Sequence, residues 1–116
     1  MTHDDLVAHC LTKPGAFVDH PWGEGHTVVK VGGKIFCFLG EASDAPGFAA
    51  KNTRDGIQEW RSRYPDHIGT GPYLNKELWS RIDLGSAGGP DDDEVRELID
   101  DSYDLIVASL PKSRRP

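Results

Sequence analysis

The apolar positions of this chain follow a helical period in three segments, with strand-like runs between them. Helices are predicted over residues 3–12, 53–64 and 91–110. Thr2, Thr53 and Asp91 stand where these helices begin, and their side-chain oxygens suit a helix N-cap. Asp91 and Glu94 also have the spacing of a capping box. Each predicted helix therefore has a chemically defined start.

A tight hairpin is predicted between the first two helices. Two β-rich runs, at residues 27–31 and 34–39, are separated only by Gly32-Gly33, and both residues of such a turn need positive φ. Regular pairing puts two sets of side chains on opposite faces of the hairpin: Val29, Val31, Lys34, Phe36 and Phe38 on one, and Val28, Lys30, Ile35, Cys37 and Leu39 on the other. Lys30 and Lys34 are thus predicted to flank the hairpin tip from opposite faces.

The remaining segments complete an α+β pattern. Residues 15–25 are predicted to form a loop, residues 48–51 a third short strand, and residues 68–74 and 78–84 a second hairpin around Asn75-Lys76-Glu77. The order α-β-β-β-α-β-β-α predicts an antiparallel β-sheet packed against helices. A length of 116 residues suits a single domain. We place it at residues 1–111, followed by a disordered basic tail at residues 112–116.

Charge is distributed unevenly along the chain, whose net charge is −6. Residues 26–82 carry eight Lys or Arg against six Asp or Glu, whereas residues 83–111 carry one against nine. Because an acidic protein repels phosphates overall, a nucleic-acid role would have to use the middle segment or the tail. No apolar run approaches the roughly 18–20 residues of a membrane helix, and the first residues lack the pattern of a signal peptide. We therefore expect no membrane association and a cytoplasmic location.

The residue types that bind metals or carry out catalysis are scattered. Cys10 and Cys37 lie in apolar patterns without an adjacent base, which is typical of small buried side chains rather than of a nucleophile, a metal pair or a disulfide. The five histidines have no metal-binding spacing, and no glycine-rich loop has a P-loop pattern. We therefore expect a non-enzymatic protein with no cofactor, and we assign no catalytic or metal-binding residue.

Three motifs make the chain similar to a known family. They are Val31-Gly32-Gly33-Lys34-Ile35-Phe36, Tyr73-Leu74-Asn75-Lys76-Glu77-Leu78-Trp79 and Asp101-Ser102-Tyr103-Asp104-Leu105-Ile106. On these residues the chain resembles the MmcQ/YjbR family over essentially its full length. The resemblance implies a fold like that of CyaY, the bacterial frataxin. Family members are often labelled DNA-binding proteins, with two β-hairpins as wings. Where the family commonly has His before the Trp, this chain has Leu78, so no role of that His carries over.

The leading functional hypothesis is a binding module that contacts DNA through its two hairpin tips, as the resemblance implies. The basic residues available for phosphates are Lys30, Lys34, Lys51, Lys76 and Arg81. The amide of Asn75 could read a base edge. Lysines at hairpin tips and strand edges are also ordinary solubilising residues, so the hypothesis requires that these side chains converge. We expect the protein to be a monomer.

Two alternatives remain open. A protein or a small ligand could bind a shallow aromatic groove formed by Trp22, Tyr73 and Trp79. A weak frataxin-like metal site could use the acids around residues 91–94 and 100–104, although acids in a first helical turn are favourable for dipole reasons alone. Structural roles also account for several residues. Trp79 and Tyr103 suit the core, and the Ser102 hydroxyl could bond back to its own helix.

Overall fold

A mixed sheet-and-helix architecture is seen in the computed structural model, which describes residues 1–23, 25–40, 45–71 and 74–116. The helices are α1 (His3–Leu11), α2 (Arg54–Arg63) and α3 (Asp92–Ser109), followed by the 3-10 turn η1 (Lys112–Arg114). The strands are β1 (Phe17–Asp19), β2 (Thr27–Val31), β3 (Lys34–Gly40), β4 (Gly47–Lys51), β5 (Ile68–Gly69) and β6 (Trp79–Asp83). The α+β class predicted from sequence is confirmed.

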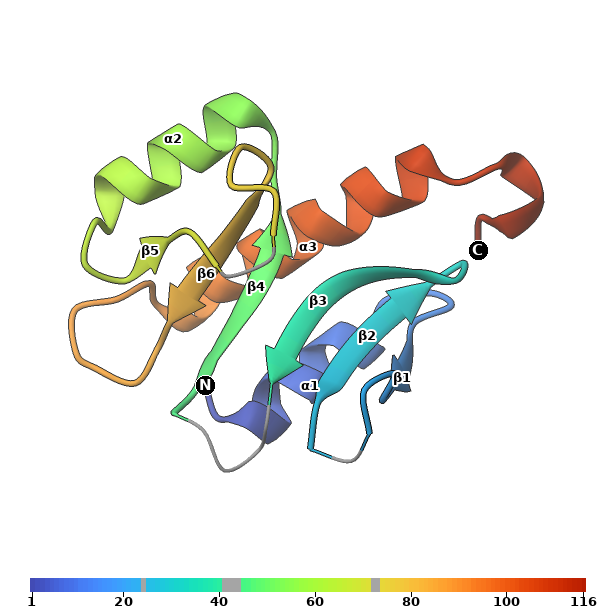
Figure 1. The fold of residues 1–116 in the computed structure, drawn as a ribbon, viewed down its shortest axis with the longest axis horizontal. Helices are drawn as coiled ribbons and strands as arrows, with labels where there is room; N and C mark the ends of the chain where they lie inside the picture. The colour runs from blue at the N-terminus through green and yellow to red at the C-terminus, as the bar shows by residue number, and fades with distance from the viewer. Residues whose placement is uncertain (24, 41–44, 72–73) are drawn as a thin grey trace.

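The strands form one sheet in the order β1-β2-β3-β4-β6-β5, and every neighbouring pair is antiparallel. Figure 1 shows α1 and α3 lying behind the sheet. Side chains from all three helices, including Cys10, Trp60 and Ile99, join the same core cluster as sheet residues. We call this the covered face. The opposite side, which carries Val28, Phe38, Ala49, Trp79 and Arg81, is the open face.

The three helices begin where the sequence predicts. Thr2 and Asp5 form a capping box at α1, and Asp91 and Glu94 form one at α3. The Thr53 hydroxyl accepts a hydrogen bond from the Gly56 amide at the start of α2. These caps satisfy amides that the helices leave without partners. The helix predictions were accurate because these starts depend on local chemistry alone.

Two strand predictions need correction. The predicted loop at residues 15–25 contains the edge strand β1, which pairs with β2 through Phe17 opposite Lys30 and Val18 opposite Val29. Three residues are too few to show an alternating pattern. In the second hairpin, β5 covers only Ile68 and Gly69 of the strand predicted at residues 68–74, of which residues 72 and 73 lie outside the described residues. Ile68 pairs with Ile82. The supposed tip of this hairpin at Asn75-Lys76-Glu77 is a turn leading into β6, in which the Asn75 carbonyl accepts from the amides of Leu78 and Trp79.

A bulge in β3 changes the predicted faces of the first hairpin. Gly32 and Gly33 have φ of 58° and 84°, as predicted. However, Lys30 pairs with Ile35 and Val29 pairs with Cys37, so Phe36 is an extra residue in β3. Regular alternation would put Phe38 on the covered face and Cys37 on the open face, and this prediction was wrong. The bulge reverses the two, because an inserted residue shifts every side chain after it to the other face.

Ser102 joins the two halves of the sheet. Cys37 pairs with Ala50 and Phe38 with Ala49, and beyond these pairs β3 and β4 diverge (Figure 1). There the buried Ser102 hydroxyl donates to the Phe36 carbonyl at 2.6 Å and accepts from the Lys51 amide at 2.8 Å. The prediction that this hydroxyl bonds to its own helix was therefore wrong. It takes the place of a direct hydrogen bond between the two strands.

The C-terminal segment packs back on the first hairpin. A Cβ at Gly32 would lie 2.5 Å from Cδ1 of Leu110 and 3.0 Å from the Arg114 carbonyl oxygen, so only glycine fits this contact. The Arg115 guanidinium donates to the carbonyls of Ala108 and Leu110, both at 3.0 Å. Residues 112–116, for which the sequence suggested disorder, form a turn that covers the end of α3.

Candidate binding surface on the open face

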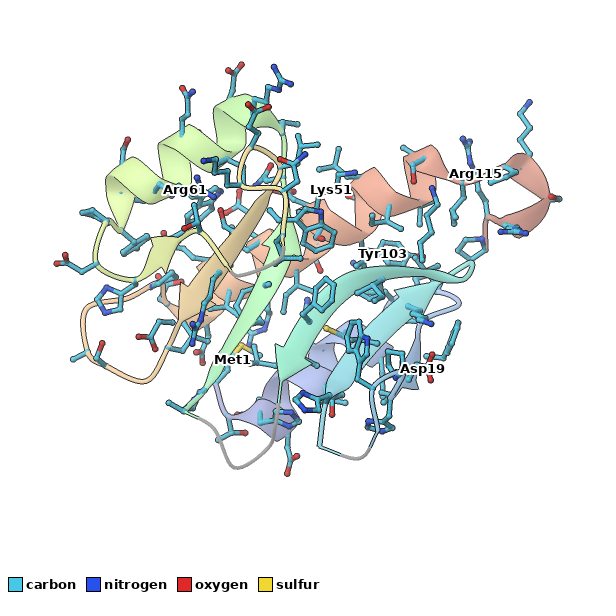
Figure 2. All side chains as sticks on the ribbon, in the orientation of Figure 1. Met1, Asp19, Lys51, Arg61, Tyr103 and Arg115 are labelled. Carbon is cyan, nitrogen blue, oxygen red and sulfur yellow. The ribbon has the colours of Figure 1, made fainter. Side chains whose placement is uncertain are left out.

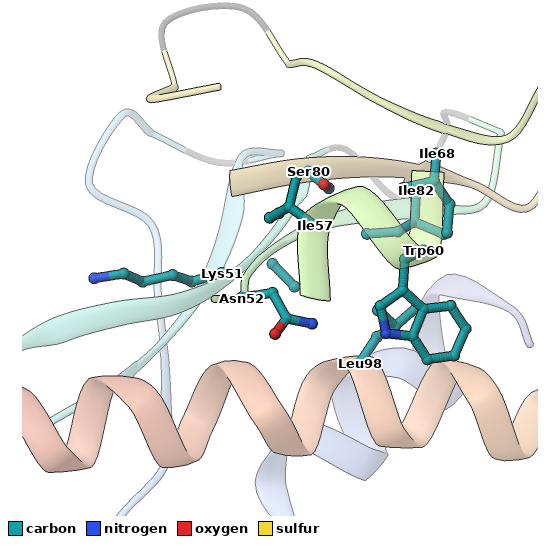
Figure 3. A pocket seen from close by; sticks show the side chains of 9 residues that line it. Lys51, Asn52, Ile57, Trp60, Ile68, Ser80, Ile82 and Leu98 are labelled. Carbon is teal, nitrogen blue, oxygen red and sulfur yellow. The ribbon is translucent and has the colours of Figure 1, made fainter. Parts of the chain in front are cut away.

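The interior holds no space for a ligand in the part of the chain that the structure describes. The more enclosed of two pockets, between α2, α3 and the sheet, has a volume of about 10 Å³. Figure 3 shows it between Asn52, Trp60 and Leu98, with the side chain of Lys51 directed away. A cavity of this size holds at most about one water molecule. A binding site must therefore be on the surface.

An aromatic row crosses the open face. Phe38 and Trp22 stack with their ring centroids 6.1 Å apart and their planes within 13°. Phe38 and Trp79 meet edge to face at 5.4 Å. Trp22 is 62% exposed, whereas Ala49 and Val28 on the same face are buried. The rings therefore cover the middle of the open face, and the outermost ring remains accessible to a partner.

The structure supports only part of the aromatic groove considered from sequence. Trp79 is half-buried and packs against the core, so it has both the structural and the surface role weighed for it. Trp22 is exposed, and Tyr73 lies outside the described residues. Sequence reasoning missed Phe38, the central ring, because the bulge in β3 cannot be read from alternation.

Cationic side chains adjoin one end of the aromatic row. Lys51 stands directly opposite Trp79 in the β4–β6 pairing, and Arg81 lies two residues further along β6 on the same face. Neither side chain forms an ion pair within the described ranges. Arg81 and Asp83 also line an open depression of about 360 Å³. Asp83 uses one carboxylate oxygen to accept from the Gly85 amide, at 2.8 Å.

Lys30 is on the open face but already has a partner. Its ammonium lies 2.7 Å from the Asp19 carboxylate on the neighbouring strand. The Lys30 hydrogen bond, followed by one from the His20 amide, holds the pKa of Asp19 below its usual value. Of the predicted phosphate contacts on this face, Lys30 is therefore the least available.

Lys34 belongs to a different group. Its ammonium lies 3.4 Å from the Ser109 hydroxyl on α3, so it faces the helix side of the hairpin tip, opposite to Lys30 as predicted. The exposed Lys112 and Arg114 lie nearby, since Arg114 contacts Gly32 at the tip. Figure 2 shows Arg115 at the far right of the molecule and Lys51 near its centre. The predicted cations therefore form two groups instead of one continuous patch.

Asn75 and Lys76 are exposed at the turn before β6. The side-chain oxygen of Asn75 accepts from the Glu77 amide at 2.9 Å, which uses one of the two acceptor positions of that oxygen and fixes the side chain against the turn. Glu77 forms an ion pair with Arg54 at 3.1 Å. Lys76 has no ion-pair partner among the described residues. Lys76 can therefore add to the charge beside Trp79, whereas Asn75 mainly shapes the turn.

Other polar and reactive residues have structural roles. The Tyr103 hydroxyl donates to the Pro14 carbonyl at 2.6 Å, which confirms its predicted role in the core. Cys10 and Cys37 are free and buried. The Cys10 thiol, together with burial, raises the pKa of Cys37 well above its usual value, which makes it a poor nucleophile.

Metal ligands do not cluster. His9 and Lys13 both pair with Asp100, at 2.8 and 3.1 Å, which ties α1 to α3. No group of three or more potential metal ligands is found among residues 1–23, 25–40, 45–71 and 74–116. Within the same ranges, no helix combines the length and apolarity needed to span a membrane.

Comparisons with known proteins identify the family. The YjbR family model matches residues 11–105 of this chain. The chain belongs to the YjbR family. It is 30% identical to the YjbR protein of Escherichia coli K12 over 117 residues, which cover 99% of this chain and 95% of that protein. It is 32% identical to the YbdF protein of Escherichia coli O157:H7 over 110 residues, or 95% and 88% of the two chains.

Two solved structures share the fold of this YjbR-family chain. Protein DR2400 of Deinococcus radiodurans, described by its DUF419 domain, superposes with a TM-score of 0.86 at 25% identity, covering 97% of this chain and 84% of that one. A Pseudomonas syringae protein gives a TM-score of 0.70 at 20% identity, covering 90% and 98%. The names of these relatives specify no activity. The function therefore has to be argued from the surface itself.

Proposed function

We propose that this YjbR-family chain is a non-enzymatic module that contacts nucleic acid through its open face. One observation carries the proposal: Lys51 and Arg81, which have no ion-pair partner among the described residues, lie on the same face as Trp79 at the end of an aromatic row. The exposed Lys76 is in the turn just before Trp79. Nucleic acid offers the two matching groups, phosphates for the cations and flat bases for the rings.

Most of the acidic residues lie away from the proposed surface; Asp83 is the acid that shares the open face with Arg81. Most of the negative charge of residues 83–111 is on α3, which packs on the covered face. The pKa of Asp101 is raised by burial and by repulsion from Glu97, Asp104 and Asp100, so these acids lie close together. A nucleic-acid strand lying on the open face would be separated from these acids of α3 by the sheet. The net charge of −6 would therefore weaken binding without excluding it.

A second candidate is duplex DNA bound at the β2–β3 tip. It is favoured by the contact of that tip with the C-terminal turn, which brings Lys112 and Arg114 near Lys34. The same three residues could also be a solubilising cluster. The two surfaces have different cations, so charge reversal at each can separate them.

The test is a titration of labelled oligonucleotides, single-stranded and duplex, at about 50 and 200 mM salt. Three phosphate contacts predict an affinity that falls roughly 20- to 40-fold across that range. The double variant Lys51→Glu/Arg81→Glu should weaken binding and flatten the salt dependence. Lys34→Glu/Lys112→Glu should have little effect.

Arg96→Glu is the matched control, because Arg96 is an exposed arginine on α3 whose guanidinium pairs with Asp93. If the Lys34 variant alone abolishes binding, the tip is the site and the open-face proposal is wrong. If the native protein binds neither form at the lower salt, nucleic-acid binding itself is refuted.

A further inference from the structure

We infer that the open face binds a single nucleic-acid strand by stacking a base on Trp22, which Phe38 supports from beneath. The inference rests on the proposed function and specifies which form of nucleic acid the surface takes. It depends on three features: the exposure of Trp22, the continuity of the rings and the small size of the pocket enclosed between the described helices and the sheet.

The exposed ring is pre-positioned for stacking. Trp22 is held nearly parallel to Phe38, within 13°, so one indole face is supported by the protein and 62% of the residue remains accessible. A supported ring loses little freedom when a base lies on it. Phe38 in turn abuts Trp79, so the rings continue from the β1 side of the sheet to β6.

Cationic side chains lie at one end of the ring row, where the sugar-phosphate backbone of a bound strand would pass. Lys51 and Arg81 flank Trp79, at the end of the row opposite to Trp22. At the Trp22 end, Lys30 is neutralised by Asp19. A nucleic-acid strand that lies along the ring row would therefore have its phosphates held mainly beside β6.

The shape of the surface favours a single nucleic-acid strand over a small molecule or a duplex. Small-molecule sites usually enclose most of their ligand, and the enclosed space here is about 10 Å³. In a duplex the bases are already stacked and paired, so their faces are not available to Trp22. An open sheet face with an exposed aromatic ring and adjacent cations instead suits an unpaired nucleic-acid strand, one of whose bases can lie on Trp22.

The experiment compares four probes by fluorescence anisotropy or by competition with the labelled strand. They are an oligo(dT) of about 12 nucleotides, its duplex with oligo(dA), an abasic strand of equal length, and thymidine monophosphate. The native chain should bind the single strand tighter than the duplex and the abasic strand, and the mononucleotide should compete weakly. Trp22→Ala should weaken single-strand binding roughly 5- to 150-fold, the loss expected for one stacked base.

Trp22→Phe should restore much of that loss, because it returns a ring. Leu11→Ala is the control for removing an exposed apolar side chain, since Leu11 is 45% exposed on α1 and belongs to the covered side. Circular dichroism establishes that each variant is folded.

The outcomes separate the inference from the proposed function. Equal binding of single strand, duplex and abasic strand, unchanged by Trp22→Ala, overturns base stacking and leaves phosphate binding in place. If thymidine monophosphate competes as tightly as the single strand, the inference that the occupant is a strand is wrong. Absence of binding to all four probes refutes the function and the inference together.

Discussion

The two faces of the sheet use aromatic rings in opposite ways. On the covered face, Phe36 is fully buried and meets Tyr103 edge to face at 5.3 Å. On the open face, Phe38 lies between Trp22 and Trp79, and the outer ring remains in solvent. Phe36 and Phe38 are two residues apart in one strand and would share a face in a regular ladder.

The bulge in β3 is what separates them. It lets Phe36 and Cys37 both face the helices and sends Phe38 to the other side. One inserted residue thus completes the core and also supplies the central ring of the surface row. We therefore predict that the covered face determines stability and that, under the proposed function, the open face determines binding; the following variants test this.

The largest expected effect is on the covered face. Phe36→Ala should lower the free energy of unfolding by about 3–5 kcal/mol, because it leaves a cavity beside Tyr103. Trp22→Ala, on the open face, should lower the free energy of unfolding by less than about 1 kcal/mol. Urea denaturation of both variants measures the difference. Equal losses would mean that the open-face rings are part of the core and not a binding surface.

Ser102→Ala should have the next largest effect. It removes a buried hydroxyl that serves the Phe36 carbonyl and the Lys51 amide, and an unsatisfied buried group costs about 1–3 kcal/mol. Ser109→Ala is the control on the same helix, because the Ser109 hydroxyl donates to the Ile106 carbonyl of its own helix. Ser109→Ala should change the free energy of unfolding by no more than about 0.5 kcal/mol. Similar losses for both would contradict a special role of Ser102 at the strand junction.

A smaller effect concerns pH. The Tyr64 hydroxyl donates to Glu94 at 2.5 Å and is the main cause that lowers the pKa of Glu94 below its usual 4.5. A carboxyl with a lowered pKa stabilises the fold above its unfolded pKa, and this stability is lost as pH falls through the folded value. The same bond raises the pKa of Tyr64 above 10.0, so it persists until the phenol ionises.

Tyr64→Phe should therefore be less stable than the native chain between about pH 5 and pH 10. The gap should narrow on acidification through the carboxyl range. Denaturation midpoints measured across this range check the prediction. A gap that stays constant down to pH 2–3 would show that the Glu94 pKa is not involved.

The smallest effect is expected from Asp19→Asn. It releases Lys30 from its 2.7 Å ion pair and adds one available cation to the open face. Single-strand affinity should rise slightly, by much less than the loss caused by Trp22→Ala. An oligo(dT) titration at low salt measures it. A decrease in affinity would indicate that the Asp19–Lys30 pair itself shapes the surface.

Helix caps and the tight turn were predictable from the sequence, whereas the β-bulge and the contacts between distant segments were not. Thr53, Asp91 and Gly32-Gly33 were interpreted correctly, because caps and tight turns depend on a few neighbouring residues. The position of Phe38 was not, because the bulge is set by packing of Phe36 and Cys37 against α1 and α3. The contact of Arg114 with Gly32 was not predicted either, because it joins parts of the chain that are far apart in sequence.

The candidate surface was predicted in part for the same reason. Trp22, Trp79, Lys51 and Arg81 were named from sequence as candidates, but in two competing hypotheses. Only the strand pairing shows that these four residues share one face. The pairing of Lys30 with Asp19 and the turn made by Asn75 could not be foreseen from composition.

The Ser102 junction also bears on how the chain folds. Its two partners lie 66 and 51 positions away, in strands that are otherwise joined by two residue pairs. Contacts of such sequence separation form late, because their loop-closure entropy must be offset first. We therefore expect the two half-sheets to become one cooperative unit when the last helix docks. We expect the amide proton of Lys51 to exchange with solvent at the rate at which that helix detaches.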